Sequence, residues 1–319
     1  MLASPVPMHI PDGFLTPAIA AVGWILAILM IIVALRQTRR QLDDRMVPMM
    51  GVLAAFIFAA QAINFPVAAG TSGHLIGAAL AAIVMGPWAA TLIMTAVLAV
   101  QGLVFQDGGL IVMGWNIVNM GVIAAFSGYL SFTLARRWAG ESRGAILAAS
   151  FAAAWISVVA AALATAIELA ASGTSPLVLA AAAMASVHAL IGIGEGIITT
   201  AAVGMLLATR PELLKVGATA PGGRTATLVL LGLSVALIVA AVSPLASPNP
   251  DGLEAVAERQ GFLALGQAAP YQILPDYTVP FISHPALTTI AAVMLGTVVV
   301  FGGAVLVGRL ATRRRAPAG

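Results

Sequence analysis

Two histidines, His9 and His74, are the side chains best suited to bind a metal ion, and each lies beside a loop-forming sequence. His9 comes just before Pro11-Asp12-Gly13, and His74 ends the segment Gly70-Thr71-Ser72-Gly73-His74. Imidazole nitrogens bind Zn, Cu, Ni and Co well. The chain has only four histidines and no cysteine, which excludes disulfides, thiolate zinc sites and iron–sulfur clusters. If both histidines lie on one side of a membrane, they can share one ion.

From spacing alone, two interpretations of this pair remain open. In the first, both imidazoles are hydrogen-bonded to loop carbonyls at a membrane interface. In the second, they belong to a metal site, for which two imidazoles are too few. A chain that begins at Met8 would add its α-amine and the peptide nitrogen of His9. Four nitrogens in a plane suit Ni(II) and Cu(II), with Co(II) next, and Pro11 keeps Ile10 out of the helical region so that the terminus can fold back as a hook. Seven residues precede Met8, so this site is expected only if the mature chain starts at Met8.

Composition indicates an integral membrane protein. Of the 319 residues, 61% are hydrophobic and only 8% are charged, whereas soluble domains carry about 25% charged residues. A core of this length cannot absorb so much apolar surface, so we expect membrane lipid to be the solvent. The net charge of +3 does not indicate a nucleic-acid partner, because the basic residues form short clusters beside apolar runs, as membrane topology requires.

Nine apolar runs are long enough, or nearly so, to cross about 30 Å of hydrocarbon. With the N-terminus outside and the C-terminus inside, the basic clusters at 36–45, 136–143, 210–224 and 309–315 all fall inside. The same parity places His9, His74 and His284 at the outer face. The expected spans are 14–36, 47–65, 74–86, 88–105, 112–135, 145–171, 177–208, 225–243 and 286–309.

The third run is too short and too rich in Gly and Ala for an ordinary lipid-facing helix. Irregular backbone survives at membrane depth only where protein buries it or where it lines a cavity. We therefore expect 66–73 to dip inward as a loop that delivers His74 below the surface. Four polar residues near this loop are candidates to hold it or to hydrogen-bond the imidazoles, namely Asn64, Gln61, Thr71 and Ser72.

Several motifs together carry a resemblance to a known family. They are Met8-His9-Ile10-Pro11-Asp12-Gly13-Phe14, the Gly70–His74 segment with Leu75-Ile76-Gly77-Ala78-Ala79, Met85-Gly86-Pro87-Trp88, and His188-Ala189-Leu190-Ile191-Gly192-Ile193-Gly194-Glu195-Gly196. In this order they resemble the CbiM/NikM family, the substrate-binding membrane subunits of cobalt and nickel energy-coupling factor (ECF) transporters. The resemblance implies Co²⁺ or Ni²⁺ as the transported substrate and Met8, His9 and His74 as its ligands.

The C-terminal region resembles the small partner subunit CbiN/NikN, through Pro250-Asp251-Gly252-Leu253-Glu254 and Pro275-Asp276-Tyr277. This implies a natural fusion: a metal-binding membrane core at 1–210, a basic cytoplasmic linker at 211–224, and a two-span accessory region at 225–319 with an outer loop. The expected fold is thus all-α and polytopic, with about seven helices in the core and two in the accessory region, in the inner or plasma membrane.

The resemblance also implies separate partners: a transmembrane coupling subunit and ATP-binding subunits of the CbiQ/CbiO type. The chain has no Gly-x-x-x-x-Gly-Lys loop, so we expect ATP hydrolysis in those subunits and no enzymatic activity here. One rival is an ion-gradient-driven secondary transporter that uses His188 and Glu195, two turns apart on one helix face, as a proton relay. Another is an intramembrane metalloenzyme, for which the nearest base to His74 in the outer loops is Asp107.

Overall fold

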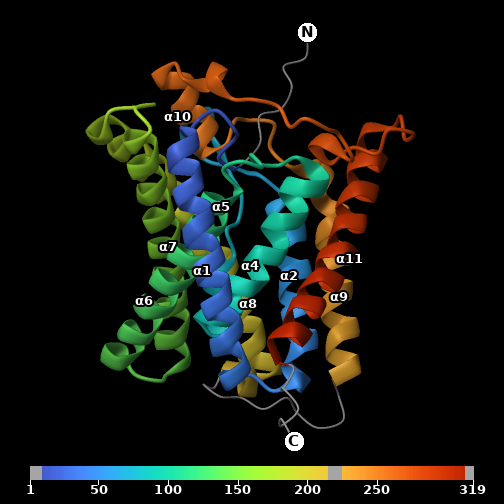
Figure 1. The fold of residues 1–319 in the computed structure, drawn as a ribbon. Helices are drawn as coiled ribbons and strands as arrows, with labels where there is room; N and C mark the ends of the chain where they lie inside the picture. Colours follow the sequence, from blue (N-terminus) through green and yellow to red (C-terminus); the bar gives the residue numbers. More distant parts are fainter. Residues whose placement is uncertain (1–8, 215–224, 313–319) are drawn as a thin grey trace, which may run out of the picture.

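The computed structural model describes residues 9–214 and 225–312, and its helices pack side by side in a tall bundle (Figure 1). Within the described part of the chain, seven helices are long and apolar enough to span a membrane. The longer helices are α1 (Pro17–Gln41), α2 (Val47–Gln61), α4 (Pro87–Val100), α6 (Ala124–Ala139), α7 (Arg143–Ala171), α8 (Leu177–Thr209), α9 (Thr225–Val242) and α11 (Pro285–Thr312). The shorter elements are β1 (Phe65–Pro66), β2 (Ser72–Gly73), α3 (Ala78–Met85), α5 (Met113–Asn116) and α10 (Gly252–Gln260).

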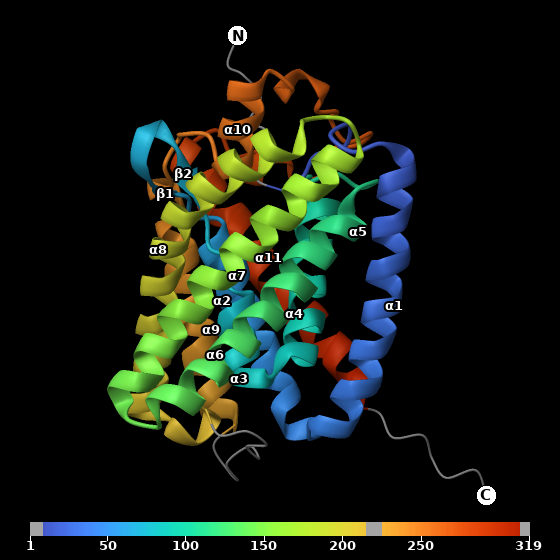
Figure 2. The same ribbon diagram turned by 90° about the vertical axis from the view of Figure 1, so that its left-hand side faces the viewer.

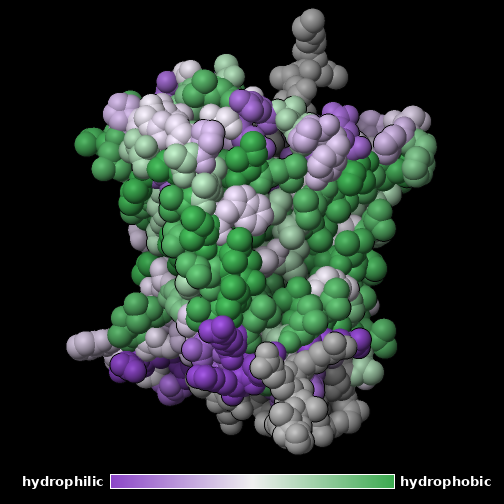
Figure 3. All heavy atoms as spheres, viewed as in Figure 1, coloured by the Kyte–Doolittle hydropathy of each residue, from purple (hydrophilic) through white to green (hydrophobic). Residues whose placement is uncertain are grey.

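A belt of apolar side chains surrounds the middle of the bundle, between two more polar ends (Figure 3). Large aliphatic side chains in this belt are exposed, among them Ile25 at 59%, Leu230 at 67% and Ile238 at 66%. Exposure on this scale would be costly in water but is favourable against hydrocarbon. The helical, membrane-spanning architecture expected from composition is therefore confirmed.

Arginines gather at one end of the bundle. They occupy the last turns of α1 (Arg39, Arg40), α6 (Arg136, Arg137) and α11 (Arg309), and all three helices end at the lower side in Figure 1. Cations also interact favourably with the negative end of a helix dipole. The polar segment that contains α10 covers the opposite, upper end.

The chain around His74 combines a small hairpin with a buried half-helix. Strands β1 and β2 pair antiparallel, with Phe65 opposite Gly73 and Pro66 opposite Ser72, and they lie near the upper end (Figure 2). The chain then enters the protein interior, where every residue of the eight-residue helix α3 is buried. The short third run of the sequence thus becomes a half-helix enclosed by protein, as its length predicts.

Glycines with positive φ angles bound α3 at both ends. Gly77 precedes it with φ 78° and Gly86 follows it with φ 81°, a region that residues with a Cβ rarely adopt. At Gly77 a Cβ would also lie 2.8 Å from a side-chain carbon of Ile57 on α2. These two residues let the chain turn sharply into α3 and then directly into α4.

The C-terminal region packs against the rest of the bundle. Helix α9 lies along α2, and α11 contacts both α2 and α4. Between them, α10 packs on α8 and begins with a capping box, in which Asp251 accepts from the backbone of Glu254 and Glu254 accepts from that of Asp251. The loop between α9 and α11 therefore lies over the upper end of the bundle (Figure 1), and its Asp251 lines the same cavity as His9 and His74.

Candidate metal site

Backbone contacts fix the position of the segment that carries His9. Asn116, at the end of α5, makes a reciprocal pair with Ile10: its side chain accepts from the Ile10 amide at 3.1 Å and donates to the Ile10 carbonyl at 3.1 Å. The Asp12 carboxylate accepts from three successive backbone amides, those of Leu110, Ile111 and Val112, at 2.8–3.2 Å. The Pro-Asp-Gly turn thereby anchors the hook to the loop between α4 and α5.

The imidazole of His9 is enclosed and oriented by one carboxylate. Its Nδ1 lies 3.0 Å from Oδ1 of Asp107, and the side chain is nearly fully buried, as is that of Asp107. Its other nitrogen, Nε2, is buried and has no hydrogen-bond partner among the described residues. A buried polar atom without a partner is costly, so Nε2 is the atom of this ring that is available to bind a metal ion.

Charge around His9 alters the pKa values of both partners. Burial is the largest single effect and lowers the pKa of the His9 imidazole, but Asp107 and, to a smaller extent, Asp251 together outweigh it, so that the pKa is raised above 6.5. Burial likewise raises the pKa of Asp107, but His9 and the Tyr277 hydroxyl outweigh it, and the net pKa is lowered. Asp107 therefore stays ionised and holds the His9 ring in one orientation.

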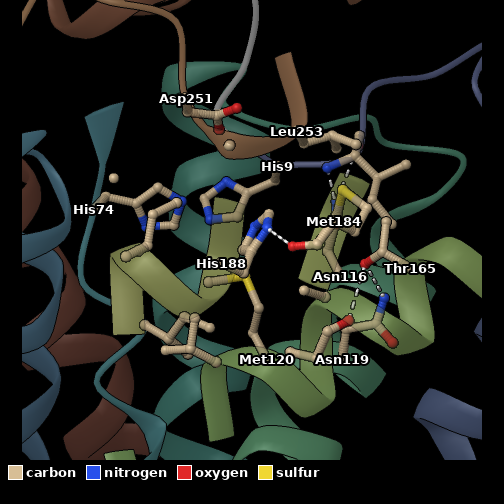
Figure 4. Close-up of a pocket in the computed structure, with 18 residues that line it drawn as sticks. His9, His74, Asn116, Asn119, Met120, Thr165, Met184, His188, Asp251 and Leu253 are labelled. Atoms are coloured by element: carbon tan, nitrogen blue, oxygen red, sulfur yellow. Dashed lines mark hydrogen bonds between the residues drawn. The ribbon is translucent and has the colours of Figure 1, made fainter. Parts of the chain in front are cut away.

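The loop delivers His74 to the side of His9. The two ring centroids are 5.5 Å apart with an interplanar angle of 62°, and Nδ1 of His74 lies 2.9 Å from the carbonyl oxygen of Leu75. Figure 4 shows both rings facing one cavity. The structure thus brings together the two histidines that the sequence singles out, although 64 residues separate them.

A cavity of about 70 Å³ lies between these rings and helix α8. His9, His74, His188 and Asp251 line it, together with the thioethers of Met120 and Met184 (Figure 4). That volume is ample for an ion with bound water. No group of three or more His, Asp or Glu within residues 9–214 and 225–312 is already arranged to hold a metal ion, so binding requires the side chains to close around it. Met8, the third predicted ligand, lies outside the described residues.

The four polar residues expected near the loop occupy different places. The Gln61 side chain donates to the Ile76 carbonyl and accepts from Gln101, so it holds the loop rather than a ring. Ser72 donates from its hydroxyl to the Asn249 carbonyl at 2.8 Å, and its amide donates to that of Pro250. The buried Thr71 continues the hairpin through its carbonyl, which accepts from Val67. The Asn64 carbonyl accepts from Ser247, which ties the hairpin to the C-terminal region.

Several residues that build the site carry no strong signal in the sequence. Asp107 orients His9, Asn116 fixes Ile10, and the Tyr277 hydroxyl donates to Asp107 at 2.7 Å. Asn116 is a polar residue inside an apolar run, and Tyr277 belongs to a Pro-Asp-Tyr motif, but neither feature predicts its partner. Only the fold brings these residues to the hook.

The two ionisable residues of α8 do different things. The Glu195 carboxylate is fully buried and accepts from the backbone amides of Ile76 at 2.6 Å and Gly77 at 2.8 Å. It therefore holds the backbone that joins His74 to the start of α3. His188, two turns nearer the start of α8, lines the cavity itself. This placement favours support of the metal site over a proton relay between the two residues.

Comparison with known proteins agrees with this architecture. Residues 9–213 match the family model of the cobalt uptake substrate-specific transmembrane region, and residues 226–313 match the PDGLE domain. A provisionally named fused nickel transport protein, NikMN, of Archaeoglobus fulgidus is 37% identical over 299 residues, covering 92% of this chain and 95% of that protein. The cobalt transport protein CbiM of Sorangium cellulosum is 34% identical over 212 residues, covering 65% and 94%.

A solved structure has a similar fold. The crystal structure of a truncated transition metal transporter superposes with a TM-score of 0.57 at 35% sequence identity, covering 63% of this chain and 98% of that one. The first family model alone matches well over half of the chain. The chain therefore belongs to the family of cobalt uptake substrate-specific transmembrane regions, joined in one polypeptide to a PDGLE domain.

Proposed function

We propose that this chain is the substrate-capture subunit of an ATP-driven importer for Co²⁺ or Ni²⁺ of the energy-coupling factor type. One observation carries the proposal: the buried Nε2 of His9 has no partner among the described residues, and the His74 ring lies beside it over a shared cavity. The names of its relatives, which are nickel and cobalt transport proteins, support the same substrates. ATP hydrolysis takes place in separate ATP-binding subunits, joined to this one by a transmembrane coupling subunit.

The proposed ligands are His9, His74 and the amine of a chain that begins at Met8. An ion chelated by the backbone nitrogen of His9 takes Nδ1 of the same ring, since only that atom closes a six-membered chelate. Nδ1 now bonds Asp107, so this mode requires that hydrogen bond to open, whereas coordination through Nε2 leaves it in place.

The site faces the outside of the cell membrane in this proposal. The arginine-rich helix ends lie at the opposite end of the bundle, and basic residues favour the cytoplasmic side. The capture cavity therefore opens outward, and the coupling subunits receive the ion from the inner side.

Metal analysis of the purified chain tests the proposal. The protein, in detergent or lipid nanodiscs, is loaded with Ni²⁺ or Co²⁺, and bound metal and affinity are measured by mass spectrometry and titration calorimetry. We expect about one ion per chain. In His74→Ala the affinity should fall by at least about tenfold, because loss of a residue that only hydrogen-bonds a ligand already has an effect of that size, and loss of a ligand should have a larger one.

A matched control is available in His284, whose exposed ring lies before α11. Its Nδ1 accepts from the amide of Leu287, a cap that His284→Asn preserves. This variant removes an imidazole outside the cavity and is expected to bind metal as the unmodified chain does. Equal affinity in His74→Ala, or no metal in the unmodified chain, would refute the proposed function.

A further inference from the structure

The side chain of Gln101 is fully buried where α4 passes into a π-helical turn, Gln101–Phe105. Its Nε2 donates to the side-chain oxygen of Gln61 at 2.8 Å, and Nε2 of Gln61 donates to the Ile76 carbonyl at 2.8 Å. Ile76 follows His74 by two residues. Through one intermediary, Gln101 is therefore bonded to the backbone of the loop that carries His74.

Gln101 is also bonded to the groups that orient His9. The backbone amide of Asp107 donates to the Gln101 carbonyl at 3.0 Å. The side-chain nitrogen of Gln101 faces the Tyr277 hydroxyl oxygen at 3.5 Å, which is the longest contact of the series, and that hydroxyl donates to Asp107 at 2.7 Å. Asp107 then meets Nδ1 of His9 at 3.0 Å. A continuous series of hydrogen bonds thus runs from the loop of one proposed ligand to the ring of the other, with Gln101 at its centre.

The direction of each bond in this series follows from its neighbours. The Ile76 carbonyl can only accept, so the nitrogen of Gln61 faces it and the oxygen of Gln61 faces Gln101. Gln101 must then present its NH₂ group, which can only donate. The Tyr277 oxygen accepts from that group, so the single proton of the hydroxyl turns to the Asp107 carboxylate. A backbone carbonyl in the hairpin loop thereby sets how Tyr277 holds the carboxylate next to the hook.

We propose that Gln101 is a positioning residue for metal capture, which couples the segment of His9 to the loop of His74 and keeps the two rings adjacent before an ion arrives. This inference rests on the proposed function and leaves its ligands unchanged. Oε1 of Gln101 is buried and has no hydrogen-bond partner among the described residues, a cost that an apolar side chain of similar size would avoid. Ligands that are already held in place bind more tightly, because less order has to be gained on binding.

Gln101→Met in the full chain tests this role, because methionine fills a similar volume but donates to neither neighbour. Ni²⁺ affinity is measured by titration calorimetry. Bound Co²⁺ serves as a second probe, since its visible absorption reports the number and type of its ligands. We expect about three- to tenfold weaker binding, no more than the smallest loss typical for a group bonded directly to a ligand. The Co²⁺ spectrum at saturation should stay unchanged, because the ligands are the same.

Two further variants serve as control and as reserve. Gln260→Met is the matched control: its amide accepts from Ser175 and donates to the Leu179 carbonyl, outside the series, so its metal affinity should equal that of the unmodified chain. Gln101→Glu is the second test variant, because a carboxyl group in either protonation state cannot donate to two neighbours at once. It should show the same loss of affinity, including where Gln101→Met does not elute as a single folded species.

A double-mutant cycle with Tyr277→Phe separates positioning from packing. If Gln101 acts through the Tyr277 hydroxyl, one break in the series is enough. The double variant should then bind Ni²⁺ only slightly more weakly than the weaker of the two single variants. Effects of independent packing defects would instead multiply.

The outcomes distinguish this inference from the proposed function. If Gln101→Met and Gln101→Glu bind Ni²⁺ as the unmodified chain does while His74→Ala loses metal, the capture function stands and Gln101 is not a positioning residue. Fold losses that multiply fully in the cycle, or a changed Co²⁺ spectrum at saturation, would also overturn the inference. If the unmodified chain binds neither Co²⁺ nor Ni²⁺, the proposed function itself is wrong.

Discussion

The Tyr277 hydroxyl donates a 2.7 Å hydrogen bond to Oδ2 of Asp107, and the other oxygen of that carboxylate lies 3.0 Å from Nδ1 of His9. A residue of the PDGLE domain thus orients, through one intermediary, a proposed ligand near the start of the chain. Backbone strain accompanies this contact: Gln106, Asp276 and Tyr277 adopt positive φ angles of 53–56°. Such conformations cost about 1–2 kcal/mol each and persist only where surrounding contacts impose them.

Tyr277→Phe removes the hydroxyl and leaves the ring, which stacks on Phe105. One oxygen of a buried carboxylate then loses its donor, at a cost of about 1–3 kcal/mol, and the hold on the His9 ring weakens. We expect several-fold weaker Ni²⁺ binding and a lower unfolding temperature. Tyr271→Phe is the matched control, because that hydroxyl donates to the Leu103 carbonyl in a more exposed position. Equal metal affinity in the two variants would contradict a link between Tyr277 and the site.

Glu195→Gln tests whether Glu195 holds the backbone that follows His74. The carboxylate accepts from the Ile76 and Gly77 amides with separate oxygens, whereas a glutamine offers one oxygen and turns its NH₂ toward the second amide. One buried N–H then lacks an acceptor, which costs about 1–3 kcal/mol. We expect lower thermal stability together with weaker metal binding.

Glu168→Gln supplies a comparison, since Glu168 is another buried carboxylate, which accepts from Asn119 on the facing segment and is not bonded to the loop of His74. Its metal affinity should match that of the unmodified chain. A proton relay predicts a different pattern for Glu195→Gln: transport lost with unchanged metal binding and stability. That result would favour the ion-gradient-driven transporter.

Acid should weaken metal capture, and Asp107 should set the pH at which this begins. The pKa of His9 is raised above 6.5 because the effects of Asp107 and, to a smaller extent, Asp251 together exceed that of burial. The metal-free ring therefore keeps its proton at a higher pH than an ordinary histidine, and an incoming ion has to displace that proton. Below the pKa of His9, affinity should fall by about tenfold per pH unit for each proton displaced.

Asp107→Asn should lower the pKa of His9, whereas Asp107 raises it. Without the charge of Asp107, burial is opposed only by the smaller effect of Asp251, so the pKa of His9 falls and the weakening should begin at a lower pH than in the unmodified chain. Calorimetric titrations between pH 5 and pH 8 measure both curves. Identical pH dependence in the two proteins would show that His9 does not exchange a proton for the ion.

Local sequence patterns predict the helices well. The expected spans at 145–171 and 177–208 appear as Arg143–Ala171 and Leu177–Thr209, because long apolar runs bounded by Ser, Gly, Pro and Arg leave few alternatives in lipid. The pairing of His9 with His74 is also predictable, since motif order and topology place both at one end. The inside and outside assignment of those ends stays a prediction.

The residues that hold the hook and its histidine in place cannot be predicted from the spacing of residues in the sequence. Asp107 and Tyr277 are 170 residues apart, and Asn116 meets Ile10 across 106 residues. Such contacts follow from how helices pack, which hydrophobic periodicity does not specify in a chain where nearly every position is apolar. Glu195 shows the limit clearly: its type and burial fit a proton carrier and an anchor for the backbone equally, and the two backbone partners that favour the second role cannot be read from the sequence.

The eight-residue helix α3 joins the loop of His74 at Gly77 to the start of α4 at Gly86. At 1.5 Å per residue this helix is only about 12 Å long. It is buried in the protein, and a glycine lies at each of its ends. Every residue of α3 is buried, so the loop that carries the proposed ligand His74 is joined to α4 entirely through the protein interior.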